Sequence, residues 1–223
     1  AHDAGALVVA DNTFLSPVGQ NPLELGADVV LHSTTKYING HSDVVGGVII
    51  AKDAALAEEL AWWGNCLGLT DSPFDSFQTM RGLRTLNVRF QEHEKNAAAI
   101  VDFLSGHPGV KKVYYPGLPD HPGHDVAARQ QKSFGAMISF ELEADNASVP
   151  KFLEPLRLFT LAESLGGVES LIAHPCTMTH AAMAAEDHRA AGLSEGLLRL
   201  SIGIENAEDL VNDLENGFSA LGF

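Results

Sequence analysis

The sequence has few cysteines, few basic residues and no long apolar run. Its two cysteines, Cys66 and Cys176, form no CxxC pair and no disulfide framework, which is typical of a reducing cytosol. The apolar runs are too short to cross a bilayer. Residues 1–6 carry neither the basic nor the apolar part of a signal peptide. These features predict a cytoplasmic protein.

Basic residues are outnumbered by acidic ones. Lys and Arg total 14 and Asp and Glu total 29, so the formal net charge is −15. A surface of this sign repels nucleic-acid phosphate and anionic membranes, so we expect neither as a partner. A small acidic substrate is still possible, because local arginines can bind it. With 45% hydrophobic and 19% charged residues, the composition is that of a globular protein.

The first residue is Ala1, and no initiator Met is present. The stretch 1–6 reads like the end of a helix that runs into a strand. We therefore expect the sequence to begin within a domain.

Three short apolar runs in the first quarter of the sequence predict strands. Leu7–Ala10 and Asp28–His32 are expected to be buried, with a short helix over Pro22–Ala27 between them. A helical crossover favours a right-handed parallel βαβ unit. The connection to Val48–Ala51 is too short for a helix, so that strand should run antiparallel.

The middle of the sequence is predicted to be helical. One amphipathic helix places Leu56, Leu60 and Trp63 on one face. A second covers about Asp75–Thr85. A third, longer helix ends at 106–108 and has one apolar stripe, formed by Ala97, Ile100, Val101 and Leu104.

The last part alternates apolar and polar residues, as half-buried strands do. Such segments are Val110–Tyr115, Ala136–Glu143 and Leu198–Ile202. A final helix should begin with Asn206 as its N-cap and bury Leu210, Leu214 and Phe218. We predict an α/β protein of two units, 1–95 and 96–223.

Lys36 directly follows a predicted strand and is flanked by hydroxyl side chains. Most loop lysines are simply solvated. A partly desolvated lysine, however, has a lowered pKa and can act as a Schiff-base nucleophile. The hydroxyls of Ser33 and Thr35 can donate hydrogen bonds to phosphate, at the sheet edge where α/β proteins bind ligands.

Asp11 follows the neighbouring predicted strand and should lie at the same edge. Alone, it could equally be a turn former or a helix cap. A carboxylate there can also pair with a protonated pyridine nitrogen. Asp11 together with Ser33, Thr35 and Lys36 therefore predicts a site for pyridoxal 5'-phosphate (PLP).

Several motifs resemble those of the cystathionine γ-synthase/γ-lyase family, which are PLP-dependent enzymes of fold type I. These motifs are 9–14, 33–43, 81–86, 161–167 and 199–205. Segments 59–63 and 75–77 resemble the bacterial γ-synthase branch most. The resemblance runs from end to end. It implies a C-terminal portion, with part of the large PLP-binding domain in 1–95 and the small domain in 96–223.

The resemblance also implies a role for each matching residue. Lys36 would bind the cofactor and move protons, Asp11 would hold the pyridine nitrogen, and Ser33 and Thr35 would hold the phosphate. Substrate-binding roles fall to six residues: Arg199, Ser164, Leu165, Glu163, Asn12 and Asn65. Arg199 would clamp the α-carboxylate with its planar fork, while Asn65 could reach a neighbouring subunit's site.

The reaction implied is a γ-replacement in which O-succinyl-homoserine and cysteine give cystathionine and succinate. Cystathionine γ-lyase, methionine γ-lyase and homoserine-ester sulfhydrylase are the alternatives, and so is a non-catalytic fragment. The family implies a homotetramer. It also implies that preceding residues complete the pocket, so that this chain alone is not a competent enzyme.

Histidines are numerous but do not have metal-binding spacing. His174 and His180 flank Thr177-Met178-Thr179, and His121 and His124 lie in a Pro/Gly-rich segment. Neither pair has the helical spacing or the cysteine partners of a zinc site. We expect no metal.

Overall fold

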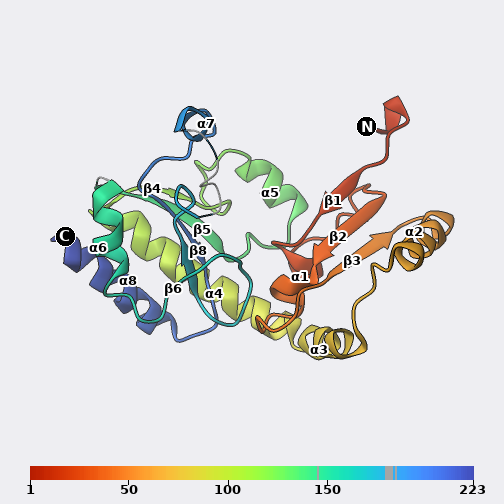
Figure 1. Cartoon of the computed structure of the whole chain (residues 1–223). Coiled ribbons are helices and arrows are strands. Elements are labelled where there is room, and N and C mark those ends of the chain that lie inside the picture. The colour runs from red at the N-terminus through yellow and green to blue at the C-terminus, as the bar shows by residue number, and fades with distance from the viewer. Residues whose placement is uncertain (145, 179–182, 184) are drawn as a thin grey trace.

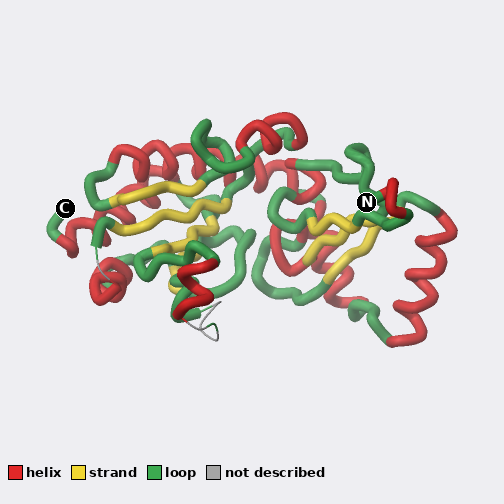
Figure 2. The backbone as a smooth tube through the Cα atoms, turned by 90° about the horizontal axis from the view of Figure 1, so that it is seen from above, coloured by secondary structure: helices red, strands yellow, loops and turns green. Residues whose placement is uncertain are grey.

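The computed structural model describes residues 1–144, 146–178, 183 and 185–223. Strands form two sheets that lie side by side, one near each terminus (Figures 1 and 2). The first sheet has the order β1-β2-β3 and the second the order β4-β5-β8-β7-β6. The structure is thus α/β with mixed sheets, as predicted.

The first sheet contains β1 (Val9–Asp11), β2 (Val29–Ser33) and β3 (Gly47–Ala51). β1 and β2 are parallel and β3 is antiparallel to β2, which confirms both predicted directions. The expected helix over Pro22–Ala27 is wrong. That stretch is a series of turns in which the amides of Leu25 and Ala27 both donate to the Pro22 carbonyl, and Gly26 leaves the helical region with φ +104°.

Burial of the first strand was also predicted wrongly. Leu7 is 61% exposed and Val9 is 58% exposed, because β1 is an edge strand and no described element packs over these side chains. β3 is the other edge strand of this sheet, and its Ile49 is 59% exposed. The apolar runs therefore predicted the positions of the strands correctly, but they did not predict which of the strand side chains are buried.

The second sheet contains β4 (Val110–Tyr114), β5 (Met137–Leu142), β6 (Thr160–Leu161), β7 (Leu171–Ala173) and β8 (Leu197–Ser201). All its pairs are antiparallel except β6 with β7. The segment predicted as half-buried at Leu198–Ile202 is almost fully buried, because β8 is the central strand. β6 and β7 were not predicted from the sequence.

The α-helices are α1 (Ser16–Gly19), α2 (Ala54–Leu67), α3 (Pro73–Leu83), α4 (Leu86–Gly106), α5 (His124–Gln130), α6 (Val149–Leu153), α7 (Ala185–Ala190) and α8 (Ala207–Leu221). Short helical turns occupy His2–Ala4, Thr34–Ile38 and Asn146–Ser148. In the described part of the chain, no helix is long and apolar enough to cross a membrane.

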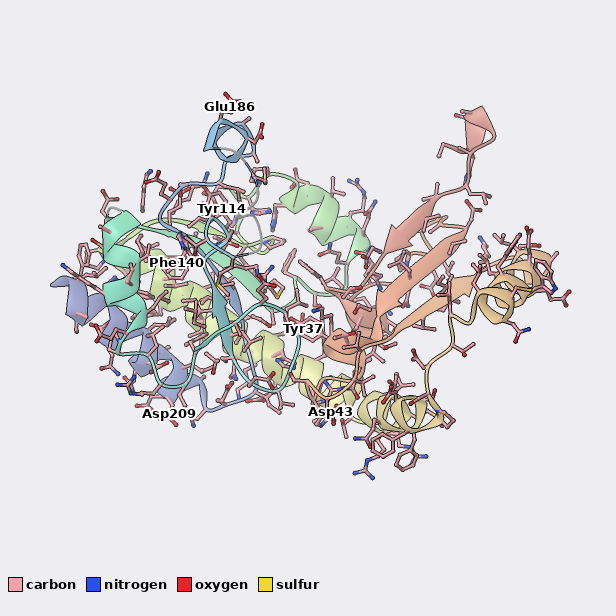
Figure 3. All side chains as sticks on the ribbon, in the orientation of Figure 1. Tyr37, Asp43, Tyr114, Phe140, Glu186 and Asp209 are labelled. Atoms are coloured by element: carbon pink, nitrogen blue, oxygen red, sulfur yellow. The ribbon has the colours of Figure 1, made fainter. Side chains whose placement is uncertain are left out.

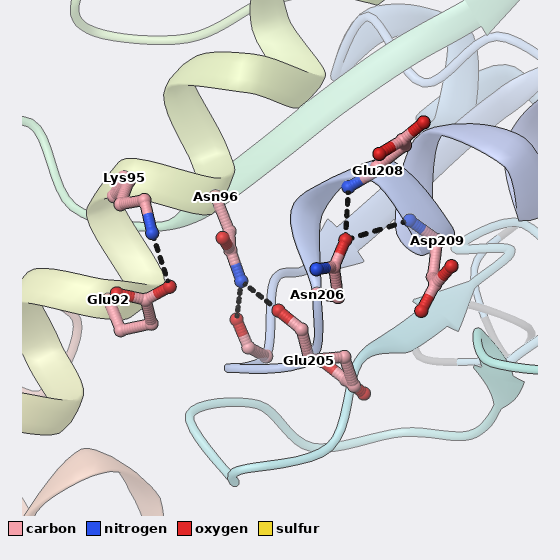
Figure 4. Close-up of polar contacts among 8 residues, drawn as sticks. Glu92, Lys95, Asn96, Glu205, Asn206, Glu208 and Asp209 are labelled. Carbon is pink, nitrogen blue, oxygen red and sulfur yellow. Dashed lines mark hydrogen bonds and ion pairs between the residues drawn. The ribbon is translucent and has the colours of Figure 1, made fainter.

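Helices α4 and α8 pack together against the second sheet and form the main core. The predicted stripe of α4 is buried there, and Leu210, Leu214 and Phe218 of α8 are completely buried, as predicted. Asn206 caps α8 by accepting hydrogen bonds from the amides of Glu208 and Asp209 (Figure 4).

Helix α4 continues from the main core to the region of Tyr37 and Phe90, a second and smaller cluster. The predicted boundary at residue 95 lies inside this helix. The division into units 1–95 and 96–223 stays a prediction.

Candidate active site

Lys36 lies in the tight turn that follows β2. The backbone of Thr34–Ile38 forms a π-type turn, and Lys36 itself departs from helical geometry with φ −89° and ψ −134°. Its neighbour Tyr37 is fully buried where the first sheet meets the rest of the molecule (Figure 3). The turn therefore fixes the backbone while the Lys36 side chain remains partly accessible.

The Lys36 side chain reaches the other half of the molecule. Its Nζ donates a hydrogen bond of 2.6 Å to Ser164 Oγ. Arg199 Nη2 donates to the Ser164 carbonyl at 3.1 Å. The structure thus brings together three predicted site residues that are widely separated in the sequence.

Ser164 is held in an unusual backbone conformation. Its φ is +86°, a left-handed value that is rare outside glycine. Gly166 follows with φ +77°, and its amide donates to Ser201 Oγ at 2.8 Å. Backbone strain of this kind persists only where surrounding contacts impose it, and it is concentrated at functional sites.

The electrostatics of the cluster make Lys36 easier to deprotonate than an ordinary lysine. Burial lowers the pKa of Lys36, and the nearby Arg199 guanidinium lowers that pKa further. Burial also lowers the pKa of Arg199, whereas the Glu163 carboxylate acts in the opposite direction. A lysine with a lowered pKa is a better nucleophile and proton acceptor.

Asp11, Ser33 and Asn65 line one open hollow of about 980 Å³ between β3 and α2. Asp11 Oδ1 accepts a hydrogen bond from the Thr13 amide, which leaves its other oxygen without a hydrogen bond among the described residues. The Ser33 amide donates to Thr13 Oγ1 at 2.8 Å, so Thr13 holds the two strand ends together. This role of Thr13 was not predicted from the sequence.

Thr35 lies on the other side of the turn, in a hollow with Glu163 and Ser164. Its Oγ1 donates to the Gly46 carbonyl at 3.3 Å and accepts from the Gly46 amide at 3.1 Å. Ser33 and Thr35 therefore face different hollows. A shared phosphate-binding role for them stays a prediction.

The remaining predicted residues have different surroundings. Leu165 is buried beside Tyr37 in the smaller cluster. Asn12 is also buried, and its amide donates to the carbonyls of Ser16 and Gln20. These bonds hold the loop after β1 and do not connect Asn12 with Lys36, and the substrate-binding role of Asn12 stays a prediction.

His174 and His124, from the two predicted histidine pairs, are held by hydrogen bonds within the protein. His174 contacts Thr177 Oγ1 and the Glu195 carbonyl, and His124 contacts the Pro116 carbonyl. His180 lies outside the described residues. Within the described ranges, no three His, Cys, Asp or Glu side chains group together as metal ligands.

Comparison with known proteins identifies the family. The model of the family described as Cys/Met metabolism PLP-dependent enzyme matches residues 1–219. The chain belongs to this family. Its fold is accordingly that of the fold-type I PLP enzymes.

Named relatives include both synthases and lyases. Cystathionine gamma-synthase of Escherichia coli (strain K12) is 62% identical over 220 residues, covering 99% of this chain and 57% of the relative. Cystathionine beta-lyase of Coxiella burnetii is 52% identical over 216 residues, covering 96% of this chain and 56% of the relative. The chain thus spans a little over half the length of these relatives.

Among solved structures, cystathionine gamma synthase from Xanthomonas oryzae pv. oryzae, in complex with aminoacrylate and cysteine, has a TM-score of 0.96. It is 66% identical, and the match covers 100% of this chain and 57% of the other. The similarity therefore extends through both sheets of this chain.

Proposed function

We propose that the protein containing this chain catalyses a PLP-dependent γ-replacement in which O-succinyl-homoserine and cysteine give cystathionine and succinate. The observation that carries the proposal is the cluster of Lys36, Ser164 and Arg199. It joins a lysine of lowered pKa to a cation suited to a substrate carboxylate. The similarity to cystathionine gamma-synthases supports this choice of reaction.

The residues present fit the cofactor chemically. Lys36 offers a partly desolvated amine. Asp11, which keeps one carboxylate oxygen without a hydrogen bond among the described residues, lines a hollow large enough for a small aromatic ring, beside the Ser33 end of β2. When bound, PLP withdraws electrons from the substrate carbon skeleton and so acidifies its C–H bonds.

Within this site, each residue has a role that follows from its chemistry. Arg199 binds the substrate α-carboxylate through two parallel N–H donors. Lys36, with its lowered pKa, accepts a proton from the substrate and returns it. Ser164 accepts a hydrogen bond from Lys36 Nζ and so keeps the amine directed toward the substrate bound at Arg199.

Replacing Lys36 with Ala tests the proposal. The protein should be expressed with whatever sequence precedes Ala1 in its gene. We expect Lys36→Ala to lose the visible absorbance of lysine-bound PLP and nearly all turnover. The exposed Lys52, changed to Ala, is the matched control. Retained activity in Lys36→Ala contradicts the proposal.

A lyase is the second candidate, because lyases are found among the relatives. The substrates distinguish the two reactions. O-Succinyl-homoserine with cysteine should give cystathionine, whereas a γ-lyase would release a 2-oxo acid from cystathionine or methionine. A sulfhydrylase would use sulfide in place of cysteine. Cystathionine formation slower than these reactions would favour the alternatives.

We further propose a homotetramer, and a site that residues 1–223 do not complete alone. Large apolar side chains on α2 and α3 are exposed, among them Trp62, Trp63, Phe74 and Phe77. Such surfaces usually pack against another chain or segment. Sedimentation of the full-length protein should give four chains per particle, and residues 1–223 expressed alone should lack turnover.

A further inference from the structure

Arg89, on α4, is buried without an anionic partner. It is only 5% exposed, and none of the ion pairs among the described residues involves it. A buried guanidinium is costly unless its donors are satisfied. A structure that retains one therefore has to use its hydrogen bonds.

All three nitrogens of Arg89 donate. Nη1 bonds the carbonyl of Tyr37 at 2.9 Å, and Nη2 bonds those of Ile38 at 3.2 Å and Gly82 at 2.8 Å. Nε donates to Thr85 Oγ1 at 3.1 Å. Tyr37 and Ile38 are the residues immediately after Lys36, so Arg89 binds the last carbonyls of the Lys36 turn, as a helix C-cap does.

Two glycines allow this close packing. Gly40 has φ +73°, and a Cβ there would overlap the Arg89 guanidinium. A Cβ on Gly82 would overlap the Asn39 carbonyl. The chain after Lys36 is therefore pressed directly against Arg89 and the end of α3. A shift of the guanidinium would have to move the turn.

The same helix face holds the other half of the site. One and two turns after Arg89, His93 Nδ1 donates to the Ile202 carbonyl at 2.7 Å, and Asn96 Nδ2 donates to the Gly203 and Glu205 carbonyls (Figure 4). These carbonyls follow directly on β8, which carries Arg199. Helix α4 thus contacts both the Lys36 turn and the end of the Arg199 strand.

We propose that Arg89 is a positioning residue, which sets the Lys36 amine against Ser164 and Arg199 by holding the turn that carries it. The proposal rests on the proposed function of Lys36. Arg89 itself touches neither substrate nor cofactor. The planar Arg89 guanidinium suits this role better than a lysine ammonium, because it binds several backbone carbonyls at fixed angles.

The test uses the full-length protein with Arg89→Lys and Arg89→Gln, and with Arg84→Lys and Arg84→Gln as controls on an exposed arginine. The first measurement is the pH dependence of the rate at which the apoprotein takes up PLP, which reports the protonation of Lys36. The second is kcat and KM for O-succinyl-homoserine.

We expect Arg89→Gln to lower kcat/KM about 100-fold, mainly through kcat, since small misplacements of reacting groups have effects of this size. The midpoint of PLP uptake should rise, because a loosened Lys36 escapes burial and Arg199. Arg89→Lys keeps the positive charge, so a higher midpoint of PLP uptake in this variant reports only the displacement of the Lys36 turn. Its kcat/KM should fall about tenfold, as one point charge replaces the fork.

The outcomes separate the two proposals. If the unaltered protein takes up no PLP, the proposed function is wrong. If it takes up PLP and both Arg89 variants keep its midpoint and kcat, the positioning role is wrong while the function stands. Should Arg89→Gln fail to fold, Arg89→Lys decides.

Discussion

Gly166 packs directly against the backbone of the Lys36 turn. Its φ of +77° is in the left-handed region. A Cβ there would lie 2.8 Å from the Tyr37 amide nitrogen and 2.9 Å from Tyr37 Cδ2. Tyr37 cannot move aside, because its ring is fully buried and packs edge-on against Phe90 at 5.3 Å. We therefore predict that Gly166→Ala damages both stability and the site.

Two costs add in this variant. Left-handed backbone costs a non-glycine residue about 1–2 kcal/mol. Forcing a methyl group into a packed region adds about 1–3 kcal/mol. The free energy of unfolding should therefore fall by about 2–5 kcal/mol, a loss of roughly 2–4 °C in melting temperature for each kcal/mol in a chain of this size.

Gly123→Ala is the matched control. Gly123 has φ +86°, and its Cβ would meet nothing within 4 Å. This variant should lose only the backbone share, about 1–2 kcal/mol. Urea unfolding and PLP uptake of both variants give the comparison. Equal destabilisation of the two, with equal PLP uptake, would refute the argument that the Gly166 contact with Tyr37 fixes the Lys36 turn.

Three further variants test other contacts. Burial lowers the pKa of His93 from 6.5 to about 4. As the pH falls, the His93 imidazole is therefore protonated in the unfolded chain before it is protonated in the folded one. The free energy of unfolding should decline by roughly 3 kcal/mol between pH 6.5 and pH 4. Urea midpoints across this range should decline less in His93→Gln. Phe218→Ala removes a completely buried ring that packs on Phe152 at 4.9 Å, and should cost about 3–5 kcal/mol in the same assay. Arg199→Gln removes the positive charge that lowers the pKa of Lys36, so the pH midpoint of PLP uptake should rise; an unchanged midpoint would contradict this electrostatic coupling.

Local sequence patterns predicted most elements but not their surroundings. The stripe of α4 and the N-cap of α8 were readable because helix periodicity and capping are local properties. β6 and β7 have only two and three residues, too few to show a period. The exposure of β1 and the burial of β8 depend on a strand's position in its sheet, which periodicity alone does not encode.

The site was partly predictable for a similar reason. The hydroxyls beside Lys36 and the carboxylate after β1 are visible in the sequence, because the ends of neighbouring parallel strands meet. The contact of Lys36 with Ser164 spans 128 positions and could be inferred only through the family resemblance. Arg89 carried no signal of its own, since a buried arginine and a surface arginine look alike in a sequence.

The family motifs gain a physical meaning when they are placed around α4. Motif 81–86 supplies Gly82 and Thr85, which the Arg89 guanidinium binds together with the Lys36 turn. Motif 199–205 supplies the carbonyls that His93 and Asn96 bind. In both motifs, groups that accept hydrogen bonds from α4 hold one side of the site against this helix. Under the proposed positioning role of Arg89, the hydrogen bonds of Arg89, His93 and Asn96 hold the Lys36 turn and the end of the Arg199 strand against one helix, so a substitution at any of these three residues should alter the pKa of the Lys36 amine.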